Sequence, residues 1–416
     1  MIRRLNVYLR GEKAGALTED EHARLSFKYD LGARHSLSVR MPARSEEYPH
    51  AYAYPFFENL TPEGRPLEII TGRLGVSENN PFSILDKIGG DCAGAVALYK
   101  GKKPAGSNEP LREITEKDMA RLIDELPENP LFTGVDDPPR LSLAGAQSKF
   151  AVYGGPEGKY YYPNDNFPST QIIKIGNNKF TDILQNELFC MMLGQNLRLN
   201  IPQAVCLREA GGRLYLDISR YDRNVVPLQG GIFKTERIHQ EDFCQALGYP
   251  SGKKYQADGG PGLRNCYQAI IEYSRNKVAD AFSFLQWTAF NYLIGNADAH
   301  AKNLSFLHNK GKITLAPFYD LLSTEIYPEK ITSRKIAMLV NGKDRYEKIR
   351  QKDFLAVFEQ LDLNPLQAMK NVSQRFVNIM KYAETLRNSL NSYKLTASPV
   401  YDDIIALIKK HMAAFV

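Results

Sequence analysis

The stretch "GNADAHAKN", residues 295–303, directly follows the apolar run "AFSFLQWTAFNYLI" at 281–294. The apolar run predicts a buried helix, and the small polar residues after it predict a rigidly held loop. In this loop Asp298 and Asn303 stand five positions apart. Taken alone, such a pair is also explained by helix capping, since one Asp–Asn spacing occurs by chance about once in 400 residues at ordinary composition.

The same spacing separates the base from a metal-binding Asn in the catalytic loop of protein kinases. Further along, "APFYDLLS" at 316–323 carries Asp320 after a β-like run, the place expected of a second Mg²⁺-binding carboxylate. Phosphoryl transfer needs neutralisation of phosphate charge and a carboxylate that accepts the proton of the attacking hydroxyl. The pattern therefore predicts Asp298 as the base, and Asn303 and Asp320 as Mg²⁺ ligands.

Two other residues of the loop have less defined roles. Lys302 is close enough in sequence to Asp298 to face the γ-phosphate of a nucleotide. His300 either hydrogen-bonds a phosphate or serves as a structural donor that fixes the loop.

Upstream segments supply candidates for phosphate binding. "LSLAGAQSKF" at 141–150 lets backbone N–H groups approach phosphates, although a plain tight turn explains it equally. Lys174 lies in the apolar strand "QIIKIG", where an ammonium is costly unless it is paired or reaches solvent at a sheet edge. Glu187, on the next helix, is a candidate partner for Lys174, or else bridges locally. The order of turn, strand lysine, helix glutamate, Asp-x4-Asn loop and final Asp is that of a bilobal protein kinase.

The hydrophobic periodicity divides the chain into three parts. Residues 1–105 read as a β-rich subdomain with two or three helices, including a helical stretch at 56–75. Residues 106–225 read as strands around one long helix, and 226–416 as helical throughout. The expected class is α+β: a bilobal, protein-kinase-like fold with a mixed N-terminal part and an all-helical C-terminal lobe.

Composition narrows the function classes. With 43% hydrophobic and 24% charged residues, the 416-residue chain is an ordinary globular one, and its net charge of +6 is scattered. Five widely spaced cysteines predict neither a disulfide framework nor a zinc site. No signal peptide or long apolar run is found, so we expect a cytoplasmic protein without a membrane span. We find no zinc finger and no recognition-helix pattern, so the sequence gives no indication of direct DNA binding.

Five blocks of sequence together resemble the HipA family of serine/threonine kinase toxins. They are "PFFENLTPEG" at 55–64, "SLAGAQSK" at 142–149, "YQADGGPG" at 255–262, "NADAHAKN" at 296–303 and "PFYDLLS" at 317–323. The resemblance covers nearly the whole chain, with residues 1–105 matching the N-terminal subdomain of the family. It implies an ATP- and Mg²⁺-dependent kinase, the toxin of a type II toxin–antitoxin pair.

Carried over residue by residue, the resemblance implies the same roles for Asp298, Asn303 and Asp320, with Lys174 holding ATP phosphates. "LDISRYDR" at 216–223 is similar to the segment that joins the lobes and contacts adenine and ribose, the ribose through Asp222. The full nucleotide site that it implies consists of Ala144, Gly145, Ala146, Gln147, Ser148, Lys149, Lys174, Ser219, Arg220, Tyr221, Asp222, His300, Lys302, Asn303, Tyr319 and Asp320.

The resemblance also implies regulation at Ser142, which matches the autophosphorylated serine of the family; its other explanation is a strand-end hydroxyl bonded to backbone. A phosphate there adds roughly −1.5 to −2 charge and favours an ejected, inactive loop. The chain departs from the family at Ser219 and Ser148, where acidic residues are familiar. The first departure leaves a side-chain role for Ser219 in doubt, because adenine recognition there runs through the backbone.

The implied partners are a HipB-like helix-turn-helix antitoxin and operator DNA, the latter reached mainly through the antitoxin. The implied substrate is a translation protein of the aminoacyl-tRNA synthetase class, whose phosphorylation arrests growth and favours persistence. Two alternatives stay open: a small-molecule phosphotransferase on a kinase-like fold, and a non-catalytic co-repressor. The second requires a lost site, yet Lys174, Asp298, Asn303 and Asp320 are all present.

Overall fold

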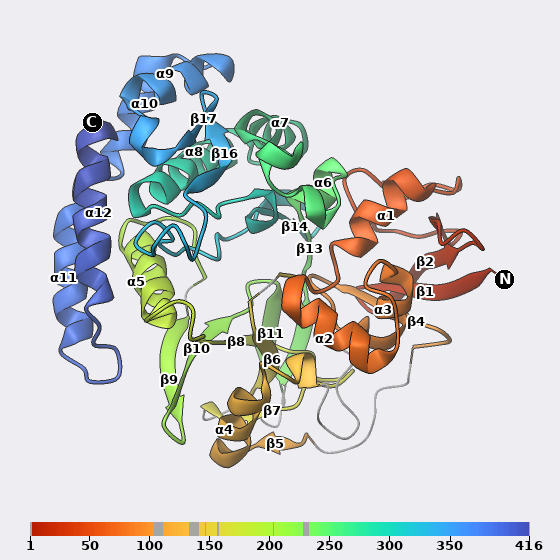
Figure 1. Cartoon of the computed structure of the whole chain (residues 1–416). Coiled ribbons are helices and arrows are strands. Elements are labelled where there is room, and N and C mark those ends of the chain that lie inside the picture. Colours follow the sequence, from red (N-terminus) through yellow and green to blue (C-terminus); the bar gives the residue numbers. More distant parts are fainter. Residues whose placement is uncertain are drawn as a thin grey trace. The chain divides into compact units, whose positions relative to one another are not determined.

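The computed structural model describes residues 2–103, 111–132, 141–145, 147–155, 158–202, 204–227 and 233–415. The chain forms two compact units, and each unit combines segments from different parts of the sequence (Figure 1). The first unit contains Met1–Ile175, Glu209–Ser251 and Phe306–Gly311, and the second contains Gly176–Arg208, Gly252–Ser305 and Lys312–Val416. The borders of these compact units differ from the domain borders that the sequence predicts near residues 105 and 225. The predicted domain borders stay predictions.

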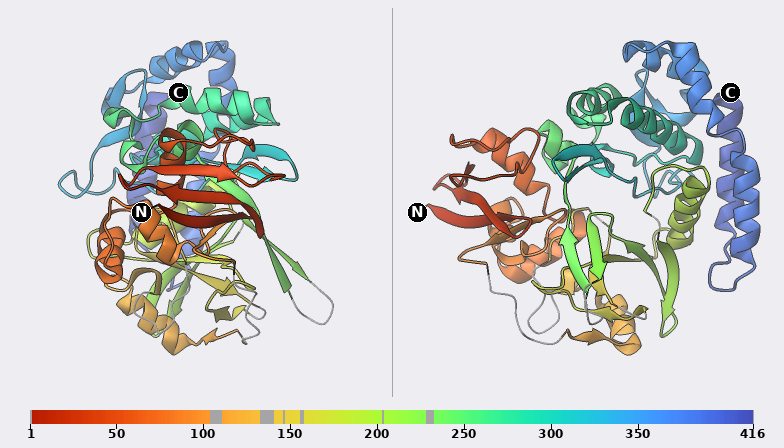
Figure 2. Two further views of the ribbon diagram at one scale, coloured as in Figure 1. Left: turned by 90° about the vertical axis from the view of Figure 1, so that its right-hand side faces the viewer. Right: turned by 180° about the vertical axis from the view of Figure 1, so that it is seen from behind.

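An antiparallel sheet forms the N-terminal part of the first unit, with its strands side by side (Figure 2). Its order is β3-β2-β1-β4, with β1 Arg3–Leu9, β2 Glu12–Glu19, β3 Leu25–Tyr29 and β4 Val96–Tyr99. Alternating residues of β1 fill the core, among them Leu5 and Val7. The helices between β3 and β4 are α1 His50–Glu58, α2 Gly64–Leu74 and α3 Pro81–Ile88.

One helical expectation in this part needs correction. The stretch predicted as helical at 56–75 is divided between α1 and α2, with a non-helical segment at 59–63. Pro62 explains the break, because a proline disfavours helical backbone at the residue before it.

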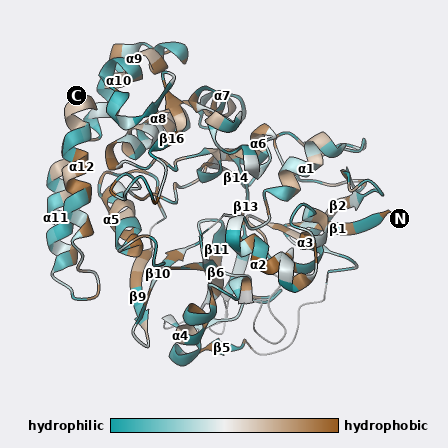
Figure 3. Cartoon of the chain, viewed as in Figure 1, coloured by the Kyte–Doolittle hydropathy of each residue, from teal (hydrophilic) through white to brown (hydrophobic). Residues whose placement is uncertain are grey.

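A six-stranded sheet has the order β5-β7-β6-β8-β10-β9. Its strands are β5 Glu113–Ile114, β6 Lys149–Gly154, β7 Tyr160–Tyr161, β8 Gln171–Ile175, β9 Val205–Ala210 and β10 Arg213–Ser219. The helix α4, Glu116–Glu125, begins at a capping box of Thr115 and Asp118. It is largely hydrophilic in Figure 3, and buries only Met119, Leu122 and Ile123.

Short elements complete the first unit. β11, Arg223–Pro227, pairs with β12, Phe233–Arg237. They are followed by β13 His239–Asp242 and α6 Phe243–Leu247, while β14, Ser305–Asn309, lies beside β13. The described residues of the two units also contain short 3-10 helices, η1 Pro130–Phe132, η3 Ser251–Lys253, η4 Gln256–Asp258, η5 Ala301–Asn303 and η6 Tyr346–Lys348.

The second unit is mainly helical. Its helices are α5 Ile183–Asn196, α7 Leu263–Tyr273, α8 Lys277–Ile294, α9 Gln351–Gln360, α10 Pro365–Gln374, α11 Ile379–Asn391 and α12 Val400–Phe415. The last two lie side by side in Figures 1 and 2. The α+β class is confirmed, and among the described helices none is long and apolar enough to cross a membrane.

The expectation that everything after residue 226 is helical is wrong. Besides β11 to β14, the structure contains β15 Lys312–Leu315 and a hairpin of β16, Lys335–Val340, with β17, Lys343–Arg345. Asn341 and Gly342 turn this hairpin with φ of 50° and 74°. An Asn-Gly pair is a strong signal for a two-residue hairpin turn, but here only the strand before it is apolar, and the helical periodicity of the surrounding sequence masks it.

Candidate active site

The polar loop begins where Gly295 ends α8 in a left-handed conformation with φ of 70°. A Cβ at this position would lie 2.5 Å from Leu407 Cδ2 and 2.9 Å from Glu325 Cβ. Both the backbone angle and the space therefore require glycine here. The direction in which the loop leaves the helix therefore depends on a backbone conformation that no larger residue adopts without strain.

Asn296 connects the two halves of the predicted site. Its buried side-chain amide donates to Asn291 Oδ1 at 2.8 Å and to the backbone oxygen of Asp320 at 3.2 Å. Its Oδ1 accepts from the backbone N–H of Asp298 at 3.2 Å. Sequence reasoning did not single out Asn296, since only the fold brings residues 298 and 320 to the same amide.

The carboxylate of Asp298 is presented outward, with 53% of the side chain exposed. Its backbone is fixed, because the carbonyl oxygen accepts from the His300 N–H at 2.8 Å and from Asn303 Nδ2 at 3.0 Å. Its Oδ1 accepts from the Tyr255 hydroxyl at 2.7 Å and lies 4.0 Å from His300 Nε2. A fixed backbone with an accessible carboxylate suits a group that takes a proton from a bound hydroxyl.

The rest of the loop is buried and tied down. His300, Lys302 and Asn303 are all buried. Tyr319, expected at the nucleotide, donates its hydroxyl to Lys302 O at 2.6 Å and lies 2.8 Å from Ser305 Oγ. The Tyr319 hydroxyl therefore holds the loop, while its expected contact with nucleotide stays a prediction.

Asp320 has positive φ, 53°, a conformation that Asp tolerates better than most residues. It follows an anchored backbone, since the Phe318 N–H donates to Asn200 O at 2.7 Å. Asn296 holds its carbonyl from the other side of the residue. These bonds fix where Asp320 projects.

The donor set fits Mg²⁺. Asn303 uses its Nδ2 for Asp298 O, which leaves its amide oxygen as the atom for a cation, and Asp320 offers a carboxylate. No group of three or more His, Cys, Asp or Glu side chains suited to a metal is found among the described residues. Mg²⁺ does not require such a group, because it is bound by one or two carboxylates together with water and substrate phosphates.

The predicted phosphate loop begins in the first unit at Ser142, which is 0% exposed. Its hydroxyl donates to Leu60 O at 2.6 Å and its N–H to Asp91 O at 3.1 Å. Gly145, with φ of 102°, accepts from Glu63 N–H at 3.3 Å through its carbonyl. The loop thus rests on the N-terminal part of the chain.

Gly145 is favoured by its backbone conformation, and it lies close to the end of the Lys149 side chain. A Cβ there would come within 2.8 Å of Lys149 Nζ. Lys149 is directly opposite Lys174 in the pairing of β6 with β8, which puts both side chains on one face of the sheet. Two ammonium groups on one face attract an anion such as phosphate.

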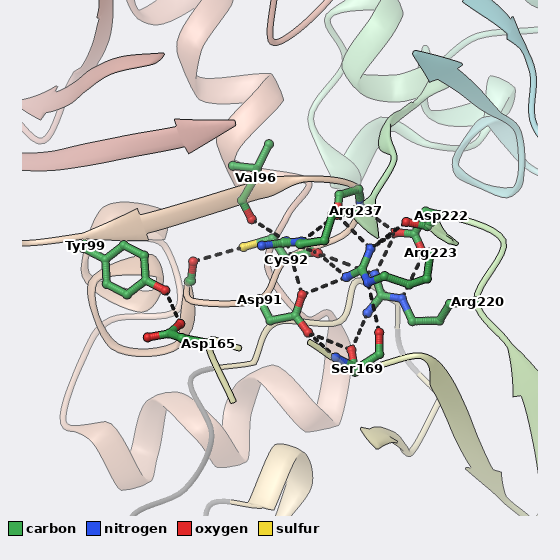
Figure 4. Close-up of polar contacts among 12 residues, drawn as sticks. Asp91, Cys92, Val96, Tyr99, Asp165, Ser169, Arg220, Asp222, Arg223 and Arg237 are labelled. Carbon is green, nitrogen blue, oxygen red and sulfur yellow. Dashed lines mark hydrogen bonds and ion pairs between the residues drawn. The ribbon is translucent and has the colours of Figure 1, made fainter. Parts of the chain in front are cut away.

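A buried ion cluster surrounds the segment expected at adenine and ribose (Figure 4). Both carboxylate oxygens of Asp222 accept from Arg220, at 2.9 and 2.8 Å, and Oδ2 also accepts from Gly94 N–H at 2.7 Å. Burial alone would raise the pKa of Asp222, but Arg220 and Arg223 lower it to about 2. The Asp222 and Arg220 side chains are thus bound to each other, and their contact with nucleotide stays a prediction.

Asp91 is the second carboxylate of this cluster. It pairs with Arg223 at 2.7 Å and Arg237 at 3.2 Å, and accepts from Ser169 Oγ at 2.7 Å. Burial would raise the pKa of Asp91, and the neighbouring arginines hold it well below the usual range. Sequence reasoning missed Asp91, because its partners lie far away along the chain.

The remaining expectations are untested. Lys174 and Glu187 are both buried but belong to different units, so their pairing stays a prediction. Ala146 lies outside the described residues. The other expected nucleotide residues are partly exposed in the first unit: Ala144, Gln147, Ser148, Ser219 and Tyr221.

Comparison with known proteins identifies the family. Residues 141–383 match the HipA-like C-terminal domain, and residues 5–99 match the HipA N-terminal domain. A putative kinase of Sinorhizobium fredii is 37% identical over 352 residues, 82% of each chain. The serine/threonine-protein kinase toxin HipA of Shewanella oneidensis is 34% identical over 69% of this chain and 66% of its own length.

A solved structure extends the likeness to the fold. It is the complex of HipA, HipB and operator DNA from Shewanella oneidensis, matched with a TM-score of 0.82 and 26% identity over 99% of this chain and 95% of that one. The kinase-like α+β fold expected from the sequence is therefore confirmed. On these matches, this chain belongs to the HipA family of serine/threonine-protein kinase toxins.

Proposed function

We propose that this protein transfers the γ-phosphate of ATP to a serine or threonine hydroxyl, with Asp298 as the base. The observation that carries the proposal is the link through Asn296, which binds the backbones of Asp298 and Asp320 at 3.2 Å each. One buried amide thereby fixes the position of the base relative to a metal ligand. Phosphoryl transfer depends mainly on such positioning.

Asn303 and Asp320 would hold Mg²⁺, which neutralises phosphate charge when bound. Asp298 orients the acceptor hydroxyl and takes its proton. Lys302 and His300 line the nucleotide side of the loop, while Lys149 and Lys174 attract phosphate oxygens from one face of their sheet. The loop at 144–149 and the segment at 219–222 complete the nucleotide site in this proposal.

The biological role proposed is that of a cytoplasmic toxin. The solved relative was obtained with HipB and operator DNA, which supports a HipB-like helix-turn-helix antitoxin as the partner here. We propose that DNA is reached mainly through that antitoxin, with co-repression of the operon. The proposed substrate is a translation protein of the aminoacyl-tRNA synthetase class, and its phosphorylation would arrest growth and favour persistence.

Ser142 is the proposed autophosphorylation site. Its hydroxyl is buried against Leu60 O, so it must leave this contact before it can accept a phosphate. A phosphorylated Ser142 cannot return to the same buried place, because two added charges would lose their hydration there. Phosphorylation would therefore favour an inactive form.

The test compares wild type with Asp298→Asn and Asp320→Asn. We expect transfer from labelled Mg-ATP to fall at least about a hundredfold in Asp298→Asn. Asp320→Asn should need more Mg²⁺ for its half-maximal rate, while Asp344→Asn, in the partly exposed strand β17, serves as the matched control. Wild-type transfer by Asp298→Asn would rule the mechanism out, and expression of the same variants in growing cells tests the toxin role.

A further inference from the structure

Tyr255 makes a direct bond to the proposed base. Its hydroxyl donates to Asp298 Oδ1 at 2.7 Å, from a segment more than forty positions upstream. Tyr255 opens the block "YQADGGPG" at 255–262, to which the proposed function assigns no role. Both residues belong to the second unit.

The segment after Tyr255 is folded tightly back on it. The N–H groups of Asp258 and Gly260 both donate to Tyr255 O, at 3.1 and 3.0 Å. A Cβ at Gly260 would come within 1.9 Å of Lys253 O and 2.7 Å of Tyr255 O. No side chain fits at residue 260, so the turn clamps the backbone of Tyr255.

The strand β16 ties this turn and the catalytic loop to one edge. The Leu339 N–H donates to Gln256 Oε1 at 2.7 Å, and the Ala337 N–H donates to Ala297 O at 2.8 Å. Residues two apart on a strand point their N–H groups the same way, about 6.6 Å apart. The immediate neighbours of Tyr255 and Asp298 are therefore held at a spacing that the strand sets.

The ring of Tyr255 is oriented as well. It meets the buried His300 ring edge-on, with centroids 5.3 Å apart and an interplanar angle of 76°. The backbone of Tyr255, the neighbouring Gln256 and the ring of Tyr255 are each held in place. The hydroxyl is therefore a fixed donor to Asp298 and not that of a mobile surface tyrosine.

We propose that Tyr255 is a positioning residue for the phosphoryl transfer, holding Oδ1 of Asp298 so that Oδ2 meets the acceptor hydroxyl. The inference rests on the proposed function. In the reaction, the acceptor oxygen bonds to the γ-phosphorus of ATP and its proton passes to Oδ2. The bond from the γ-phosphorus to the β–γ bridging oxygen breaks, and ADP leaves with that electron pair. Tyr255 keeps its own proton throughout.

The test is Tyr255→Phe in the full-length protein, because phenylalanine keeps the ring against His300 and removes only the hydroxyl. Mg-ATP is the probe, with phosphate release to water and labelling of the chain both measured. We expect kcat to fall about tenfold to a hundredfold. KM for ATP and the equilibrium affinity for a fluorescent ATP analogue should stay at wild-type values. Tyr393→Phe, at a tyrosine whose residue is 66% exposed, is the matched control.

The outcomes separate the inference from the function on which it rests. A Tyr255→Phe variant with wild-type kcat, beside an inactive Asp298→Asn, overturns the positioning role and leaves the kinase intact. A rise in kcat also overturns it, since the hydroxyl would then compete with the acceptor. A lower melting temperature with kcat and KM both altered would mean a merely structural role. Activity retained in Asp298→Asn would instead remove the proposed function itself.

Discussion

The side-chain amide of Asn296 donates a hydrogen bond to the backbone oxygen of Asp320, over 3.2 Å. The same side chain accepts from the backbone of Asp298, so one buried residue sets the distance between the proposed base and a proposed metal ligand. Neither Asp298 nor Asp320 depends on its own side chain for this registration. Substituting Asn296 should therefore disturb catalysis although it removes no reacting group.

For Asn296→Ala we expect kcat to fall about tenfold to a hundredfold, because small misplacements of catalytic groups are costly. The loss of its buried bonds should also lower the free energy of unfolding by about 1–3 kcal/mol. Steady-state kinetics and urea unfolding measure the two effects. Asn371→Ala is the control, since this exposed Asn accepts a bond from Gln367 at the surface. An Asn296→Ala enzyme with wild-type kcat would contradict the registration.

For Gly295→Ala we expect a loss of stability well above that of an ordinary left-handed glycine. The strained backbone costs about 1 kcal/mol, and the contacts of a Cβ with Leu407 and Glu325 add about 1–3 kcal/mol. Gly342→Ala separates the two, because it shares positive φ, 74°, but has no atom within 4 Å of its Cβ. Thermal unfolding of both variants is the measurement, and equal losses would show that crowding at residue 295 is absent.

The arginine cluster predicts a dependence of stability on pH. The pKa of Asp222 is about 2 in the folded protein, against an ordinary value of 3.8 in the unfolded chain. Because the folded-state pKa is lowered, the contribution is complete above pH 3.8 and is lost as the pH falls towards 2. It amounts to about 2 kcal/mol. Urea unfolding between pH 6 and pH 2 should show the loss, and Asp222→Asn, though less stable at neutral pH, should show less of it.

A negative charge at position 142 should destabilise the buried conformation of the loop. Ser142→Ala loses the bond to Leu60 O and should cost about 1 kcal/mol of unfolding free energy. Ser142→Asp should cost more or drive the loop out, seen as faster hydrogen exchange at residues 141–145 and weaker binding of nucleotide. Ser77→Asp, at an exposed serine, is the control. Unchanged exchange in Ser142→Asp would contradict the need for loop departure.

The sequence reveals those parts of the site whose spacing is local. Asp298 and Asn303 share one loop, and their spacing predicted their roles once Asp320 was considered with them. Tyr255 and Asn296 were not assigned roles, because their bonds to Asp298 and Asp320 depend on the folded chain. A hydroxyl and an amide carry no periodic or compositional signal of such partners.

The nucleotide segment shows the opposite difficulty. In the sequence Asp222 is one acidic residue beside a tyrosine, and the family resemblance implies a ribose as its partner. In the structure its carboxylate binds Arg220 and the backbone of Gly94, which lies 128 positions away. Among elements, the α+β class and the long α5 and α8 helices were predictable from periodicity, whereas the β16–β17 hairpin lay hidden among helical patterns.

Asp91 constrains any exchange of domains between this chain and a relative. It lies in the N-terminal domain, its carboxylate binds Arg223 of the C-terminal domain, and its carbonyl holds the backbone of Ser142. A chimera that joins the N-terminal domain of one relative to the C-terminal domain of another would leave a buried charge unmatched unless both partners travel together. Residue 91 is therefore where a mismatched recombinant should fail first.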